Sequence, residues 1–207
     1  MDNAIEKTGL ITQAGTSIRI VFVTMVICCL LYPLVILGLG QTLTPYSANG
    51  SLVRNGQSGI AGSELLAQGF SRPEYFWPRP SAVDYNAAAA GGSNLSPTNP
   101  ELRVRAKALV VRFEASSDNP IPADLVTASG SGLDPNITLA AAKYQAERVA
   151  SARGLPAETV IELLRKYAYR PGGALTPQSR DQRVINVLLV NMALDRLGKL
   201  NEREPRG

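Results

Sequence analysis

The sequence contains no histidine, and its only two cysteines are the adjacent Cys28 and Cys29. Histidine is the commonest general base and the commonest transition-metal ligand in proteins, so its absence excludes most hydrolase triads and most zinc sites. Because both cysteines lie within an apolar run, the rest of the chain has no disulfide framework. A domain formed by the rest of the chain must therefore be held together by its hydrophobic core.

Charged residues are also scarce, at 18% of the chain, and the formal net charge is +4. No run of five or more basic residues occurs, and Arg103, Arg105 and Lys107 alternate with aliphatic residues. This pattern argues against a nucleic-acid partner. The sequence also lacks a phosphate-binding Gly-x-x-x-x-Gly-Lys-Ser/Thr loop, so we expect the soluble part alone neither to hydrolyse nor to bind ATP.

Long apolar runs are limited to one, at residues 20–40, which contains no charged side chain. At about 1.5 Å rise per residue, a helix of this length spans roughly 30 Å, the thickness of a bilayer core. The run is longer than the apolar region of a signal peptide, and no small-x-small cleavage site follows it. We therefore predict a retained transmembrane helix in contact with the lipid bilayer, with a kink at Pro33.

The positions of basic residues predict the direction of this helix. Lys7 and Arg19 precede the apolar run, whereas the first basic residue after it is Arg54. By the positive-inside rule, residues 1–19 are expected in the cytoplasm and the soluble part outside it. The chain would then cross the membrane once.

Composition divides the soluble part into a juxtamembrane linker at 41–61, rich in Ser, Asn and Gly, and a domain at 62–207. A short apolar group predicts a strand at 63–70, and Pro73, Pro78 and Pro80 predict an extended path after it. Apolar spacing and capping residues predict four helices, at about 99–114, 138–153, 157–167 and 181–197. We expect an α+β fold in which helices predominate.

A Gly-x-Gly pattern at Gly130 and Gly132 superficially resembles a phosphate-binding loop. Asp134 follows closely and would repel a phosphate, and Pro135 has no N–H to donate. We therefore interpret this segment as a structural turn.

Several longer motifs occur in a fixed order along the domain. They are residues 78–82, 85–86, 91–95 and 97–100, then 125–135, 145, 148–150 and 152–154, then 184–188, 191 and 193–195. In this order the motifs resemble the KdpC family, the C subunit of the bacterial Kdp potassium-transporting ATPase. Ala67, Ser96 and Asn136 depart from the family pattern, so the resemblance supports no role for these three positions.

The resemblance implies a non-catalytic subunit of a high-affinity potassium importer in the bacterial inner (plasma) membrane. Its partners would be a channel-like potassium-translocating subunit and a P-type ATPase subunit. The ATPase subunit would use ATP and magnesium, potassium would be the transported ion, and this chain would bind no cofactor or metal itself. The family is also credited with aiding nucleotide binding, but the predicted orientation places the bilayer between the domain and cytoplasmic ATP. We therefore expect a role in assembly, on the outer side near potassium entry.

Polar residues of these motifs form the candidate site that the resemblance implies. They are Arg79, Ser81, Asn86, Ser93, Asn94, Thr98, Asn99, Ser129, Asp134 and Gln145. No catalytic residue is predicted. Two alternatives remain: a membrane-anchored envelope enzyme with Ser81 or Ser93 as nucleophile, and a scaffold for another transporter, which would differ only in its partner.

Overall fold

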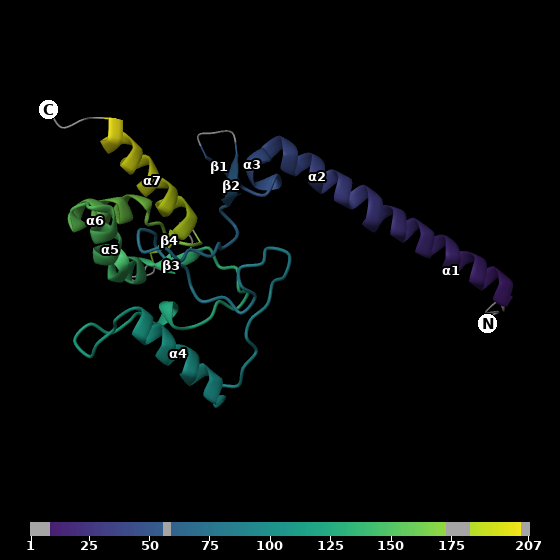
Figure 1. Cartoon of the computed structure of the whole chain (residues 1–207). Coiled ribbons are helices and arrows are strands. Elements are labelled where there is room, and N and C mark those ends of the chain that lie inside the picture. The colour runs from purple at the N-terminus through teal and green to yellow at the C-terminus, as the bar shows by residue number, and fades with distance from the viewer. Residues whose placement is uncertain (1–8, 56–58, 173–182, 204–207) are drawn as a thin grey trace. The chain divides into compact units, whose positions relative to one another are not determined.

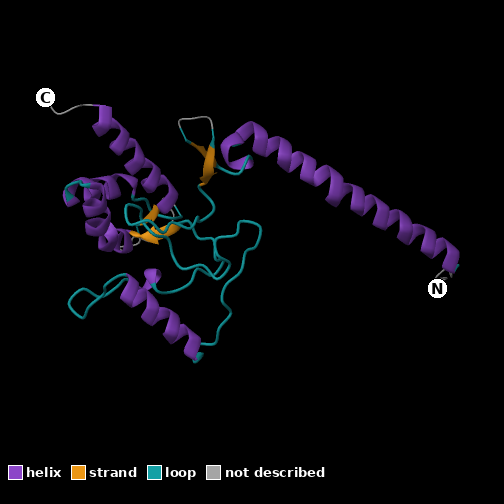
Figure 2. Cartoon of the chain, in the orientation of Figure 1, coloured by secondary structure: helices purple, strands orange, loops and turns teal. Residues whose placement is uncertain are grey.

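The computed structural model describes residues 9–55, 59–172 and 183–203, without the side chains of 199–203 (Figure 1). The chain divides into two compact units, Met1–Ser51 and Leu52–Gly207. The first unit is helical, and the second combines helices with two small sheets (Figure 2). Each unit has its own architecture.

The first unit contains one helix, Leu10–Leu43, that is long and apolar enough to cross a membrane. It consists of α1 (Leu10–Met25), a π-helical segment η1 (Val26–Leu31) and α2 (Tyr32–Leu43), and a short helix α3 (Pro45–Ala48) follows. The apolar run predicted at 20–40 lies inside this helix.

Pro33 explains the π-helical segment. Proline has no N–H, and its ring collides with the carbonyl group four residues earlier in a regular α-helix. In the structure, the backbone N–H of Tyr32 bonds to the carbonyl oxygen of Ile27, five residues earlier instead of four. The structure accommodates Pro33 by a widened turn in the residues just before it.

Two threonine hydroxyl groups within the apolar run or next to it form hydrogen bonds inside the helix itself. Thr24 Oγ1 donates to the carbonyl oxygen of Ile20 at 2.8 Å, and Thr42 Oγ1 donates to that of Gly38 at 2.9 Å. Such bonds leave no free hydroxyl donor where water is absent. They make these polar residues compatible with an apolar surrounding.

The second unit begins with an antiparallel hairpin that starts within the predicted linker at 41–61 and ends beyond it, at Ser63. The other elements follow the aromatic-proline segment, residues 70–81. The elements are β1 (Leu52–Arg54), β2 (Ile60–Ser63), α4 (Pro100–Arg112), the short 3-10 turn η2 (Ala123–Leu125), β3 (Asn136–Thr138), α5 (Leu139–Arg153), α6 (Ala157–Tyr167), β4 (Val184–Asn186) and α7 (Val187–Arg203). β1 pairs with β2 and β3 pairs with β4, both antiparallel. This mixture of helices and small sheets agrees with the predicted α+β class.

Capping residues set the ends of α4 and α5. Asn99 Oδ1 accepts a hydrogen bond from the N–H of Glu101 at 2.9 Å, and Thr138 Oγ1 accepts one from Ala141 at 3.1 Å. Gly154 ends α5 in the left-handed conformation, with φ of 62°. The helices predicted at 99–114, 138–153 and 157–167 are confirmed as α4, α5 and α6.

Two predicted elements have other bounds in the structure. The strand ends at Ser63 instead of covering 63–70, because Ser63 turns the chain by accepting from the N–H groups of Leu65 and Leu66. The last helix, predicted at 181–197, is found from Val187 onward. Residues 184–186 form β4, which pairs with β3, and α7 then continues past Gly198 to Arg203. Residues 181 and 182 lie outside the described part of the chain.

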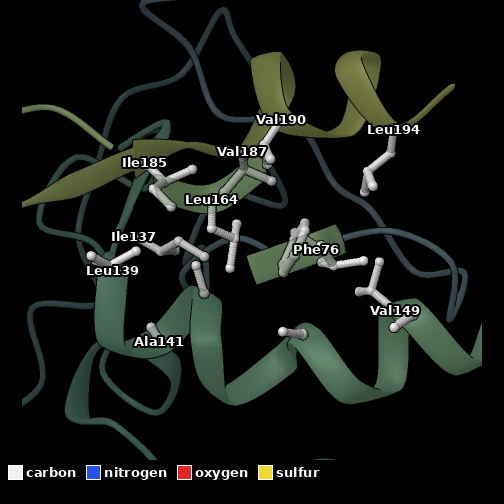
Figure 3. Close-up of a cluster of buried hydrophobic side chains, with 14 of the residues drawn as sticks. Phe76, Ile137, Leu139, Ala141, Val149, Leu164, Ile185, Val187, Val190 and Leu194 are labelled. Carbon is white, nitrogen blue, oxygen red and sulfur yellow. The ribbon is translucent and has the colours of Figure 1, made fainter. Parts of the chain in front are cut away.

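The core of the second unit lies between α5, α6, α7 and the β3–β4 pair. Phe76, which comes from the aromatic-proline segment, lies between side chains of α5 and α7 and is fully buried (Figure 3). Ile137 and Ile185 from the paired strands and Leu164 from α6 complete the cluster around it. A segment without regular structure thus supplies a central core side chain.

Two buried amide side chains hold this segment in place. Asn191 of α7 accepts from the N–H of Phe76 at 2.8 Å and donates to its carbonyl oxygen at 3.0 Å. Gln145 of α5 does the same for Trp77, at 2.8 and 3.1 Å. Each amide thus replaces the two hydrogen bonds that a neighbouring strand would offer, so an extended segment can cross the core with its backbone groups satisfied. We call this pair of contacts the amide clamps.

Arginines strengthen the same attachment. Arg148 of α5 donates from both Nη atoms to the carbonyl oxygen of Tyr75, each at 3.1 Å. Arg153 donates to the carbonyl oxygen of Glu74 at 2.7 Å and pairs with Asp195 of α7 at 2.8 Å. Four consecutive residues, 74–77, are therefore bonded to side chains of α5 and α7.

The amide clamps predict a large loss of stability on substitution. Gln145→Leu would leave the buried N–H and carbonyl groups of Trp77 without partners, which costs about 2–4 kcal/mol for the two groups together. The matched control is Glu147→Leu, an exposed position on the same helix, expected within about 0.5 kcal/mol of the unchanged chain. Urea unfolding in a nonionic detergent, followed by fluorescence of Trp77, the only tryptophan, measures both. Equal stability of the two variants would contradict the role of the clamps.

Candidate functional site

Two loops separated in the sequence meet beside the aromatic-proline segment. The N–H of Ser129 donates to the carbonyl oxygen of Pro80 at 2.9 Å, and the N–H of Gly91 donates to that of Ser131 at 2.8 Å. These backbone bonds join residues 79–81, 91–92 and 128–134. We call the joined segments the loop cluster.

Arg79 and Asp134 form the ion pair of the loop cluster. Arg79 Nη1 lies 3.1 Å from Asp134 Oδ2, and the two side chains are 26% and 33% exposed. Asp134 Oδ1 also accepts from the N–H of Asn136 at 3.0 Å, and Arg79 Nη2 donates to the carbonyl oxygen of Ala128 at 3.4 Å. The ion pair therefore links the aromatic-proline segment to the turn before β3.

The hydroxyl group of Ser81 is fully used in holding the same turn. Ser81 Oγ donates to the carbonyl oxygen of Gly132 at 2.7 Å and accepts from the N–H groups of Val83 and Tyr85, each at 3.1 Å. A serine acting as nucleophile needs a neighbouring base to take its proton. Here a backbone carbonyl occupies that position, so the geometry is that of a turn residue.

Glycines allow the loops to approach this closely. A Cβ atom on Gly132, which has φ of 69°, would lie 2.6 Å from a methyl group of Val83 and 2.8 Å from the carbonyl oxygen of Gly91. A Cβ on Gly92 would lie 2.8 Å from the carbonyl oxygen of Gly130. The Gly-x-Gly pattern is therefore a structural turn, as predicted, and it belongs to a packed loop contact.

Four of the predicted site residues meet in the loop cluster, namely Arg79, Ser81, Ser129 and Asp134. Ser129 is buried, and its Oγ accepts from the N–H of Asp134 at 3.3 Å. Gln145 lies apart from them, in the amide clamp on Trp77. Gln145 therefore contacts the aromatic-proline segment at Trp77, and the other four residues gather where this segment ends, at 79–81.

The other predicted residues lie on the loop between this segment and α4. Asn86 Oδ1 accepts from the N–H of Ala88 in a local turn, Thr98 Oγ1 lies 3.0 Å from Ser96 Oγ, and Asn99 caps α4. Their contacts are local. Ser93 is half-buried and Asn94, with φ of 50°, is exposed, and both lie in the stretch 93–95 without regular structure.

Sequence reasoning missed the surroundings of Trp77. The guanidinium carbon atoms of Arg148 and Arg112 lie 3.8 and 4.0 Å from the centre of the Trp77 ring, and the Phe113 ring meets it edge-on at 5.2 Å. Burial, together with the positive charge of Arg112, lowers the pKa of Arg148 to about 10. The sequence contained a signal for this cluster. Its only tryptophan lies among prolines, and the helices carry arginines beside their apolar positions, where a guanidinium group can reach an aromatic ring.

The loop cluster and the Trp77 surroundings offer no metal centre. In the ranges 9–55, 59–172 and 183–203, no three His, Cys, Asp or Glu side chains gather where they could hold a metal ion. The arrangement can present a rigid, partly charged surface built on the amide clamps.

Similarity to known proteins agrees with this architecture. Residues 14–196 match the family model described as KdpC, the c chain of the K+-transporting ATPase. The chain is 50% identical over 181 residues to the potassium-transporting ATPase KdpC subunit of Parvibaculum lavamentivorans, covering 87% of this chain and 95% of that one. It is 45% identical over 197 residues to the subunit of the same name from Myxococcus xanthus, covering 92% and 91%. It is 43% identical over 183 residues to the subunit of the same name from Gloeobacter violaceus, covering 88% of this chain and 95% of that one. The family match includes most of the membrane-length helix and all of α4, α5 and α6, and on this basis the chain belongs to the KdpC family of potassium-transporting ATPase subunits.

Proposed function

We propose that this chain is a non-catalytic subunit of a complex that imports potassium with high affinity, and that it helps to assemble a channel-like subunit and a P-type ATPase subunit. The ATPase subunit would use ATP and magnesium, and potassium would be the ion transported. The observation that carries the proposal is the family match over residues 14–196, because it includes most of the apolar helix and most of the second unit.

The contacts of the loop cluster support a role in assembly over catalysis. Asp134 is paired with Arg79, and Ser81 is bonded to three backbone groups. A catalytic acid, base or nucleophile needs a geometry that leaves it available to a substrate. These residues instead fix the shape of a surface, which lowers the entropy that would be lost when a partner binds.

We place this surface on the outer side of the inner (plasma) membrane. Lys7 and Arg19 precede the apolar helix, and no basic residue follows it until Arg54, which is the asymmetry typical of a cytoplasmic N-terminus. Residues 1–19 would then be cytoplasmic, 20–40 would cross the membrane, and the linker at 41–61 and the domain at 62–207 would lie outside. An outer location supports a role near potassium entry.

The orientation predicts the labelling of a single cysteine. With Cys28 and Cys29 replaced by Ala, Lys166→Cys at an exposed position of α6 should react with a membrane-impermeant maleimide in intact cells. The matched control is Asn3→Cys, which should react only after lysis. The reverse pattern of labelling would contradict the proposed orientation.

The function predicts a growth phenotype that depends on potassium. A strain lacking only this chain, with its partner subunits present and other potassium uptake routes disabled, should fail to grow at micromolar potassium and grow normally at millimolar potassium. Re-expression of the chain should restore growth. Normal growth of the deletion strain at micromolar potassium would refute the assignment.

The ion pair of the loop cluster predicts an effect on assembly. Asp134→Asn keeps the shape of the side chain but leaves Arg79 without its counter-charge, which we expect to loosen the surface and weaken partner binding by about 1–2 kcal/mol, a factor of roughly 5–30. The measurement is the amount of ATPase subunit that co-purifies in detergent with the tagged chain.

The matched control for this variant is Glu158→Gln, which breaks the exposed ion pair between Glu158 and Arg165 on α6. Exposed pairs contribute little, so co-purification should not change. Equal yields of partner with both variants would show that the loop cluster is not part of the assembly surface.

A further inference from the structure

A cavity lies between α4 and the aromatic-proline segment, next to the loop cluster, whose Pro80 and Ser81 are among its lining residues. Its volume is about 220 Å³. The aromatic side chains of Trp77, Tyr85 and Phe113 line it, together with Leu109, Arg105 and Arg112. The lining is thus mixed: aromatic and aliphatic side chains lie beside polar surface that includes two guanidinium groups supplied by one helix.

The charged side chains that line this cavity are all positive. No Asp or Glu is among the side chains that line it, and neither Arg105 nor Arg112 forms an ion pair among the described residues. The Nε atom of Arg105 is buried and has no hydrogen-bond partner in the described part of the chain. A buried donor without a partner costs free energy, so the cavity is complementary to an acceptor that the chain itself does not supply.

The backbone beside the cavity is strained in a way that fixes its wall. Asp84 and Tyr85 have consecutive positive φ angles of 49° and 57°, which are unfavourable for residues other than glycine. The hydroxyl group of Tyr85 donates to the carbonyl oxygen of Arg79 at 2.9 Å, and its ring packs against Gly69, where a Cβ atom would lie 3.0 Å from the ring. Burial raises the pKa of Tyr85, so the phenol stays neutral and does not neutralise the arginines.

We propose that this cavity binds a carboxylate carried on a small apolar or aromatic group. The planar guanidinium group of Arg105 offers paired donors that match a carboxylate, and the side chains of Tyr85, Leu109 and Phe113 offer a surface for an apolar group. The volume lies below the roughly 300–1,000 Å³ of pockets for drug-sized ligands, which limits the occupant to a group of about ten non-hydrogen atoms.

Two sources would supply this chemistry: a free small carboxylate in the surrounding solution, and an acidic side chain of a partner subunit. Both present the same group to Arg105. They differ in whether the cavity stays open in the assembled complex, which an experiment can distinguish.

The test uses Trp77 as a probe, since it lines the cavity and is the only tryptophan. Phenylacetate is titrated into the full chain in a nonionic detergent at constant ionic strength, and Trp77 fluorescence is recorded. We expect a saturable change with a dissociation constant of about 0.1–1 mM, which is reasonable for a ligand of this size. The neutral analogue phenylacetamide should bind at least about tenfold more weakly, because it lacks the charge that the guanidinium group pairs with.

Two variants distinguish binding inside the cavity from a general electrostatic attraction of the ligand to the basic residues of α4. Arg105→Gln should weaken phenylacetate binding by at least about tenfold, the loss typical of a charge-assisted hydrogen bond. Arg103→Gln removes the same charge from an exposed position of α4 that does not line the cavity, and it should change binding less than about twofold. Circular dichroism shows whether both variants remain folded.

The outcomes are distinct. No saturable change in the unchanged chain, or equal weakening by Arg105→Gln and Arg103→Gln, would overturn the proposal. Repetition with the purified complex identifies the source: a retained response supports a free carboxylate, and a lost response supports a carboxylate of a partner already in the cavity. The titration of the isolated chain does not depend on the proposed transport function, so the two proposals fail separately.

Discussion

Burial of an extended segment without a neighbouring strand is the constraint on which the second unit depends. Phe76 must lie in the core, but its backbone cannot enter the core unless its N–H and carbonyl groups find partners. Asn191 and Gln145 supply them from two different helices. The same contacts fix the distance between α5 and α7 across the segment. The amide groups therefore both provide hydrogen-bond partners for the backbone of the segment and set the spacing of the helices around it.

This constraint also explains how the loop cluster becomes rigid with so little regular structure around it. Residues 74–77 are fixed by α5 and α7, and Arg79 and Ser81 follow immediately after them in the chain. Any partner of these two side chains is therefore positioned relative to the core. The 128–134 turn is held to this segment by the ion pair of Asp134 with Arg79 and by the hydrogen bond from Ser81 to the carbonyl oxygen of Gly132. The Trp77 ring belongs to the same anchored stretch, so the cavity beside α4 is built on it as well.

The sequence was sufficient where local physics decides the structure. Asn99, Thr138 and Gly154 place helix ends by contacts within a few residues, and these ends were predicted correctly. It was insufficient where the decisive partner is distant. Val184 to Asn186 fall inside the predicted last helix, yet they form a strand because β3, far earlier in the chain, pairs with them. The grouping of Arg79 with Asp134, and the stacking of Arg112 and Arg148 on Trp77, likewise depend on tertiary contacts that spacing alone does not reveal.

The widened turn before Pro33 has a geometric consequence for the apolar helix. A π-helical turn adds about one residue to the regular repeat, so every side chain after it is rotated by roughly 100° about the helix axis compared with an uninterrupted α-helix. Side chains of α1 and α2 that would share one stripe by sequence spacing therefore point in different directions on either side of η1. A single helix of this kind can offer differently oriented contact faces at its two ends, and a scan of substitutions along it would show a change of phase at residues 26–31.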